Sequence, residues 1–311
     1  MRHALIALGI GLAAGPAAAD GYDTVRAALD AGDYPTAYAT LAEMGDGGDT
    51  LAMTMLSNLL LSEVAGPADL GLAVAWLEQA AAQGSVHAML RLGAIHQLHG
   101  QALFPDRQAP VTMAVGFPEA ADYYRQAEAA GSEVALSRLA GLYRLSMMSA
   151  LDPSLTREQE AALARSYMER AVEAGRPDAM AMLAHVIRVE DPPRSAALFR
   201  RAATLGDQVA LGILAVAPEM GGVTDPVEAL SWAYAARMAW ERDPNPRSPL
   251  FIMAGADTGH QFLEMMENII LAAPDPDRAA AEAMAAEIAA GWPNLLPGQG
   301  STQGGGLFGR N

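Results

Sequence analysis

The chain has 311 residues, of which 51% are hydrophobic and 6% aromatic, and its formal net charge is −16. This charge argues against nucleic acid as a partner, because a binding protein must neutralise phosphates with a basic face, and it equally disfavours an anionic membrane surface. The chain contains no cysteine, and all 20 of its basic residues are arginine. Disulfides, cysteine nucleophiles and every mechanism that needs a lysine are therefore excluded.

Residues 1–19 have the pattern of a secretory signal peptide. Arg2 and His3 give a basic start, an apolar run follows, and three alanines precede Asp20. The apolar run is shorter than a helix that spans a bilayer. We therefore expect a mature chain that begins at Asp20, resides in a bacterial periplasm and does not insert into a membrane.

The body of the chain, residues 20–290, repeats one pattern of small residues around a glycine. A helix over residues 22–31 is predicted to cap its start. In the copy around Gly84, alanines lie 11 and 4 residues before the glycine and 4 residues after it, and a leucine lies 8 residues after it. Copies lie near residues 37–60, 73–96, 120–144, 164–188 and 195–216, with turn glycines Gly48, Gly84, Gly131, Gly175 and Gly206, and a degenerate copy lies near 229–272.

This pattern predicts that each copy is an αα-hairpin. The glycine permits a left-handed backbone conformation that ends the first helix, and the alanines allow the two helices to approach closely. A single hairpin does not bury its apolar face, so neighbouring hairpins are expected to stack. The predicted fold class is all-α, a right-handed superhelical solenoid of stacked αα-hairpins with helical caps.

Two insertions interrupt the rhythm of the copies. The longer one, residues 97–119, carries Phe104 and Phe117, which are either partner contacts or rings that pack against the second copy. The second precedes the copy near 164–188 and contains Thr156 and Gln159, the spacing of a capping box at a helix start.

The end of the chain is expected to close the stack. Residues 257–273 and 277–290 are predicted to be two further helices, the second carrying glutamates that suit a polar outer face. Residues 291–311 are rich in glycine and have the composition of a flexible tail.

The repeated residues resemble those of the Sel1-like repeat proteins, which are related to tetratricopeptide arrays. The resemblance is carried by Ala73, Trp76, Ala80, Ala81, Gly84, Ala88, Leu92 and Gly93, and by Ala120, Tyr123, Ala127, Gly131, Ala135 and Leu139. It implies the solenoid fold and a role as a scaffold or adaptor. Bacterial periplasmic members of this family include regulators that hold a membrane sensor kinase inactive, and a similar role is one expectation here.

The sequence carries no nucleophile elbow, phosphate-binding loop or zinc-protease motif. We therefore expect a chain that is not an enzyme and has no cofactor. Three alternatives stay open: a cell-envelope enzyme that uses an acidic residue, a protein that binds a small ligand, and a periplasmic metal-binding protein. A metal site would use His87, His96 and His99 for zinc, or methionine pairs such as Met53 and Met55 for copper. Alternate residues on a helix point to different faces, so core packing is the preferred explanation of the methionines.

The first helices of such repeats are expected to line a concave face that binds another protein. In the repeat register this face includes arginines on equivalent helices, with two neighbouring aromatic residues as apolar anchors. The candidate partner-binding residues are Tyr124, Arg125, Arg165, Phe199, Arg200 and Arg237. The arginines suit an acidic peptide or domain, with a membrane-associated sensor or an envelope protein as the candidate partner. The alternative is a scattered, solvated face with intrahelical ion pairs.

Overall fold

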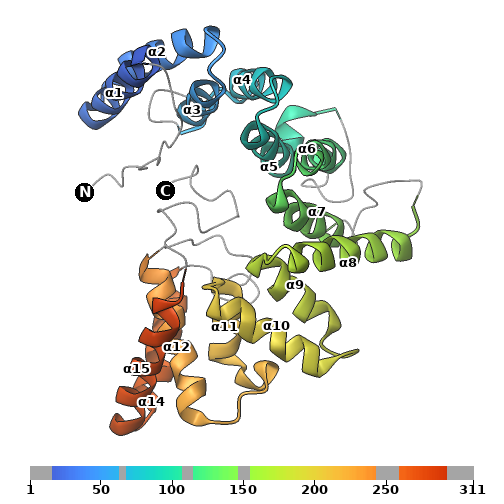
Figure 1. Ribbon diagram of the computed structural model, residues 1–311, viewed down its shortest axis with the longest axis vertical. Helices are drawn as coiled ribbons and strands as arrows, with labels where there is room; N and C mark the ends of the chain where they lie inside the picture. Colours follow the sequence, from blue (N-terminus) through green and yellow to red (C-terminus); the bar gives the residue numbers. More distant parts are fainter. Residues whose placement is uncertain (1–15, 63–67, 107–114, 146–154, 243–258, 293–311) are drawn as a thin grey trace. The chain divides into compact units, whose positions relative to one another are not determined.

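The computed structural model describes residues 16–62, 68–106, 115–145, 155–242 and 259–292, and these residues contain helices and no strand. They fall into two compact units that divide between Ala164 and Arg165. Unit 1 contains α1 (Pro16–Ala31), α2 (Tyr34–Asp46), α3 (Thr50–Leu61), α4 (Leu70–Ala82), α5 (Val86–Leu103), α6 (Phe117–Ala129), α7 (Glu133–Leu145) and the first part of α8 (Arg157–Glu173). The helices α1 to α7 follow one another in a stack (Figure 1). The all-α class and the hairpin repeat are confirmed.

Unit 2 contains the rest of α8, α9 (Pro177–Ile187), α10 (Pro192–Thr204), α11 (Gln208–Val216), the short 3-10 helix η3 (Pro218–Gly221), α12 (Pro226–Arg242), α14 (Gly259–Ala272) and α15 (Asp275–Ala290). The division falls inside α8, and the copy around Gly175 keeps the same offsets of small residues as the copies before it. Among the helices that the structure describes, none is long and apolar enough to cross a membrane.

The turn inside each hairpin forms at the glycine that the repeat pattern marks. Gly48, Gly84, Gly131, Gly175 and Gly206 all have positive φ, between 80° and 92°. The next residue then serves both helices. The backbone N–H of Ser85, for example, donates to the carbonyl of Ala80 (3.1 Å), which satisfies the end of α4, while its Oγ accepts from the N–H of Ala88 (3.3 Å) at the start of α5. Backbone groups at the ends of both helices are thus hydrogen-bonded within a turn of two residues.

The same arrangement recurs with aspartate in place of serine. Asp33, Asp49 and Asp207 each follow a glycine of positive φ and each caps the next helix through a carboxylate oxygen. Arg176 follows Gly175 but gives no side-chain cap, and Pro177 begins α9 instead. Proline at the first helical position has no N–H to leave unsatisfied, and its fixed φ suits the start of a helix.

The repeated small residues are the core of the hairpins. At the position 11 before each glycine, the side chains of Ala37, Ala73, Ala120, Ala164 and Ser195 are at most 3% exposed. Serine is tolerated in the last copy because the hydroxyl of Ser195 donates to the carbonyl of Ala184 (2.8 Å), so its buried oxygen is satisfied.

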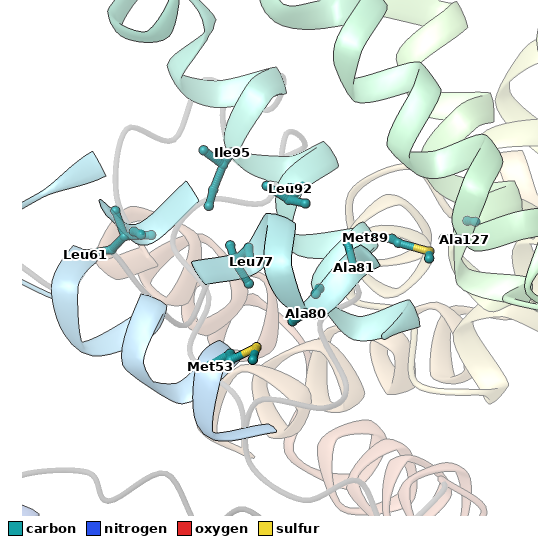
Figure 2. Close-up of a cluster of buried hydrophobic side chains, with 12 residues drawn as sticks. Met53, Leu61, Leu77, Ala80, Ala81, Met89, Leu92, Ile95 and Ala127 are labelled. Atoms are coloured by element: carbon teal, nitrogen blue, oxygen red, sulfur yellow. The ribbon is translucent and has the colours of Figure 1, made fainter. Parts of the chain in front are cut away.

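Successive hairpins share one apolar core rather than separate ones. Figure 2 shows Met53 and Leu61 of α3, Leu77 of α4 and Leu92 of α5 directed toward one another. The same cluster includes Ala127 of α6, so it joins three hairpins. Burial of these side chains is the main source of stability in a stack of this kind.

The first insertion packs against the stack rather than leaving it. Phe117 is only 4% exposed, and the half-buried ring of Phe104 stacks on His96 with centroids 5.7 Å apart. These positions support the packing interpretation of both rings. The capping box is confirmed, because the N–H of Gln159 donates to Thr156 Oγ1 (3.2 Å) and the N–H of Thr156 donates to Gln159 Oε1 (2.7 Å).

The C-terminal helices α14 and α15 agree with the predicted pair, and both pack on α12. The predicted start of the tail at residue 291 is wrong, because Trp292 is only 8% exposed. Its indole lies against Gly206, where an added Cβ would be 3.2 Å from the ring. The rest of the predicted tail, like most of the predicted signal peptide, lies outside the described residues.

We predict that Gly84→Ala lowers the free energy of unfolding by about 1–2 kcal/mol, because an L side chain at φ +87° is strained even though the space around Gly84 is open. Gly84→Asn should cost less, since asparagine tolerates this conformation better. Gly71→Ala, in the first turn of α4, is the control and should be neutral or stabilising. Urea unfolding of the three variants measures the difference, and equal midpoints would contradict the role of the turn.

Candidate functional site

The prediction that two aromatic residues are apolar anchors of a binding face is wrong. Tyr124 and Phe199 are both 0% exposed. The ring of Tyr124 lies against Gly93, where any Cβ would overlap it, and its hydroxyl donates to Gln97 Oε1 (3.1 Å). Both residues therefore belong to the packing between helices, and a partner does not reach them.

Three of the predicted arginines lie on the surface and pair with carboxylates of the same chain. Arg125 contacts Asp122 one turn earlier (2.9 Å). Arg165 of α8 contacts Glu190 (2.7 Å) and Glu169 (3.5 Å).

The third, Arg237 of α12, contacts Glu241 (3.7 Å), and its guanidinium lies over the ring of Tyr234 at 5.2 Å from the centroid. These contacts fit the alternative of a solvated face with ion pairs. Their use by a partner stays a prediction.

The fourth arginine, Arg200, holds unit 2 together. Its Nε donates to the carbonyl of Gly221 (2.6 Å) and its Nη1 contacts Glu228 (2.7 Å), so α10 is joined to both η3 and α12. A guanidinium that satisfies a carbonyl and a carboxylate at once is a structural clamp. The predicted role of Arg200 as a free anchor is therefore corrected. The four arginines also divide between the units, with Arg125 in unit 1 and the others in unit 2.

The sequence analysis missed a second set of polar residues, on the second helices of the hairpins in unit 1. Arg91 of α5 donates through Nη2 to Asn58 Oδ1 of α3 (2.6 Å), and its buried Nε has no hydrogen-bond acceptor. Arg138 of α7 lies near enough to affect the pKa of Arg91. In the part of the chain that the structure describes, neither arginine forms an ion pair with a carboxylate. Their common register, seven residues after Gly84 and Gly131, is a signal that the repeat pattern already contained.

Burial and like charge act together on this pair. Desolvation, with a smaller contribution from the charge of Arg138, lowers the pKa of Arg91 to about 10. His87, one turn earlier on α5, has its pKa lowered by burial and by the charge of Arg91. Burial is the larger cause of both shifts, and the smaller part of each comes from the positive charge of a neighbouring arginine.

The histidines proposed as a zinc site do not converge on an ion. His96 is buried between the rings of Phe104 and Tyr123, at centroid distances of 5.7 and 5.3 Å. Across the described ranges, no group of three His, Cys, Asp or Glu residues is placed to hold a metal ion. Stacking explains His96, and burial explains methionines such as Met53, which is 2% exposed.

The acidic residue with the most displaced ionisation is Asp207. Burial raises its pKa to about 7, and the nearby charge of Asp178 adds to the shift. A catalytic carboxylate can be tuned in this way. Here, however, a carboxylate oxygen accepts from the N–H of Ala210 (2.8 Å) as the N-cap of α11, so its position has a structural explanation.

The fold is that of a helical repeat protein built from αα-hairpins with a shared core. A sequence model of the Sel1 repeat matches residues 50–85, 86–109, 139–175 and 177–207. Four Sel1 repeats are thus found in the chain, which is consistent with the Sel1-like repeat protein that its repeated residues predicted. No curated protein matches it.

Two solved structures resemble the chain at low sequence identity. A Sel1 repeat protein from Oxalobacter formigenes is 17% identical, with a TM-score of 0.53, over 79% of this chain and 97% of that one. A protective antigen of uropathogenic Escherichia coli with an SLR fold is 18% identical, with a TM-score of 0.42, over 92% of this chain. This chain spans 61% of the length of that antigen. The first of these likenesses supports the fold.

We predict that Arg200→Gln lowers the free energy of unfolding by about 1–2 kcal/mol, because it removes charge-assisted hydrogen bonds that are only partly exposed. Its neighbour Arg201 is exposed, and Arg201→Gln is the matched control, with an expected change near zero. Urea unfolding measures both variants. Equal stability of the two would show that the clamp contributes nothing.

The pKa of Asp207 predicts how stability depends on pH. The folded-state pKa of about 7 lies above the ordinary value of 3.8, so the folded chain binds more protons here than the unfolded chain does between these values. This contribution is complete below about pH 4 and is lost as the pH rises toward 7. Asp207→Asn keeps a capping oxygen and removes the titration. The melting temperature of the variant, relative to the native chain, should therefore be higher at pH 8 than at pH 5.

The exposed cap Asp33 is the control for this measurement. Hydrogen bonds from Thr36 lower the pKa of Asp33, so its contribution is present at neutral pH and is lost as the pH falls. Because pH 5 and pH 8 both lie above the pKa of Asp33 in the folded and the unfolded chain, Asp33→Asn should leave the relative melting temperature unchanged between them and raise it only below about pH 4. An equal change for both variants between pH 5 and pH 8 would be inconsistent with these assignments.

Proposed function

We propose that this chain is a non-enzymatic scaffold or regulatory adaptor that binds another protein in the periplasm. The observation that carries the proposal is the stack of Sel1 hairpins, since Sel1 repeat proteins generally mediate protein–protein interactions. The alanines and leucines that recur around the turn glycines are buried, and the residues between them vary. A stack of this kind keeps its fold while its surface adapts to one partner.

The proposed location rests on residues 1–19 and on the charge. A chain with 36 acidic and 20 basic residues stays soluble and avoids anionic membranes and nucleic acid, as a free periplasmic adaptor requires. A membrane-associated sensor or an envelope protein is the proposed partner. We expect chain isolated from the periplasm to begin at Asp20, which N-terminal sequencing checks. A chain that retains Met1 there would contradict the signal peptide.

Affinity capture tests the function directly. Residues 20–311 are used as bait on cross-linked periplasm and membranes, and bound proteins are identified by mass spectrometry. We expect one dominant partner that an unrelated periplasmic bait of similar negative charge does not capture. The absence of any enriched protein would contradict the scaffold role and favour a small ligand.

The surface arginines are tested with the same bait. Arg125→Gln combined with Arg237→Gln should reduce capture if these side chains leave their intrachain carboxylates for the partner. Arg200 is not part of this test, because its loss would disturb unit 2 itself. The exposed pair Arg157→Gln and Arg201→Gln removes the same charge elsewhere and is the control. Equal capture by both double variants would remove Arg125 and Arg237 from the binding face.

A further inference from the structure

Three second helices of unit 1, α3, α5 and α7, lie along one side of its stack (Figure 1). They are linked there by polar side chains. The hydrogen bond from Arg91 to Asn58 joins α5 to α3, and Arg138 of α7 occupies the same register as Arg91, near enough for its charge to contribute to the lowered pKa of Arg91. The two guanidiniums therefore form a pair that spans two neighbouring hairpins.

This pair differs from most of the arginines that the structure describes, and it shares its half-burial with Arg144 near the end of α7, whose Nε is also buried without an acceptor. Arg125, Arg165 and Arg200 each have a carboxylate partner within 4 Å. Exposed arginines such as Arg157 and Arg201 have no such partner in the described residues, but water solvates them fully. Arg91 and Arg138 are half-buried and have no carboxylate partner among the residues that the structure describes, although the chain carries 36 acidic residues. Two partly desolvated like charges are unfavourable unless an anion neutralises them.

We propose that Arg91 and Arg138 form a carboxylate-binding site for an acidic segment of the protein partner. The site uses the second helices of the hairpins, on α5 and α7, and not the first helices on which the arginine face was predicted. Asn58 fixes the guanidinium of Arg91 from one side. This inference rests on the proposed function, because it supplies the chemistry by which a protein partner is recognised.

The geometry favours a peptide segment over a single small anion. The two arginines occupy the same register of successive hairpins, so their separation follows the packing distance of neighbouring helices, about 8–10 Å. Carboxylates three residues apart on an extended chain match this separation, at about 3.3 Å per residue. Each guanidinium fork suits one carboxylate. Because the protein is strongly acidic overall, general attraction would not bring an acidic peptide to it.

Fluorescence anisotropy with defined peptides tests the site on the full chain. The probe is a fluorescein-labelled peptide of five Gly-Gly-Glu repeats, which places acidic residues three apart, and the neutral control has Gln in place of Glu. We expect saturable binding of the acidic peptide alone, weakened by added salt. Arg91→Gln with Arg138→Gln should weaken it at least about tenfold for each arginine removed. Arg157→Gln with Arg201→Gln, with the same change in charge, should bind as the native chain does.

Two further variants distinguish a loss of binding from a loss of folding. Arg138 makes no hydrogen bond to the rest of the described chain, so Arg138→Gln alone should keep the native circular dichroism spectrum and still weaken binding. Arg91→Lys with Arg138→Lys keeps the charge but loses the fork, and should bind more weakly than the native chain. Equal binding by the native chain and Arg138→Gln would overturn the site.

Sulfate at constant ionic strength separates a peptide site from a site for free anions. If sulfate raises the melting temperature of the native chain while the acidic peptide does not bind, the assignment to a protein segment is wrong. No binding of either probe overturns the site but leaves the scaffold role intact when capture yields a partner. A captured partner that Arg91→Gln with Arg138→Gln still binds would likewise overturn the site alone. Loss of that partner together with the peptide would support both.

Discussion

The left-handed glycine inside each hairpin is the constraint on which the other contacts depend. It reverses the chain within two residues, so the next residue reaches the end of one helix with its N–H and the start of the other with its side chain. This fixes the distance between the two helices of a hairpin. Alanine is then the residue that fits between them, and the aromatic and leucine side chains fill what remains. Local backbone chemistry thus sets the spacing, and burial of the shared core supplies the stability.

This order of causes explains which parts of the fold could be predicted from the sequence. Turn glycines, caps and small core residues act over a few residues, so their spacing is visible in the chain and the structure agrees with it. Trp292 was missed because its partner, Gly206, is distant in sequence. Tyr124 and Phe199 were assigned to the wrong face for a related reason. A first helix packs both on its own hairpin and on the preceding one, so less of its circumference is exposed than one amphipathic stripe suggests.

The contacts of charged residues are even harder to predict from the sequence when they join distant elements. The ion pair of Arg125 with Asp122 lies within one helix and follows from their spacing. The contacts of Arg200 with Gly221 and Glu228 depend on how three elements meet, which no local pattern records. Nor does the sequence state that Arg91 and Arg138 have no carboxylate partner in the described part of the chain, because that property depends on every element packed around them. The sequence does contain their equal register, and the structure shows that both side chains at this register are half-buried.

One position of the repeat carries side chains of different chemistry without a change in how the hairpins pack. Seven residues after the successive turn glycines lie Met55, Arg91, Arg138, Met182 and Ile213, and all five are half-buried. Neighbouring repeat positions hold alanine or leucine in nearly every copy, because substitution there would disturb the packing. This position tolerates thioether, guanidinium and branched aliphatic side chains at the same exposure, so packing alone does not select its residue. The two arginines therefore stand where the hairpin places no structural demand for charge, and their partial burial is unfavourable to the isolated chain. A partner's carboxylates would offset that cost. We therefore assign this position of the repeat to recognition of a partner and the neighbouring positions to packing.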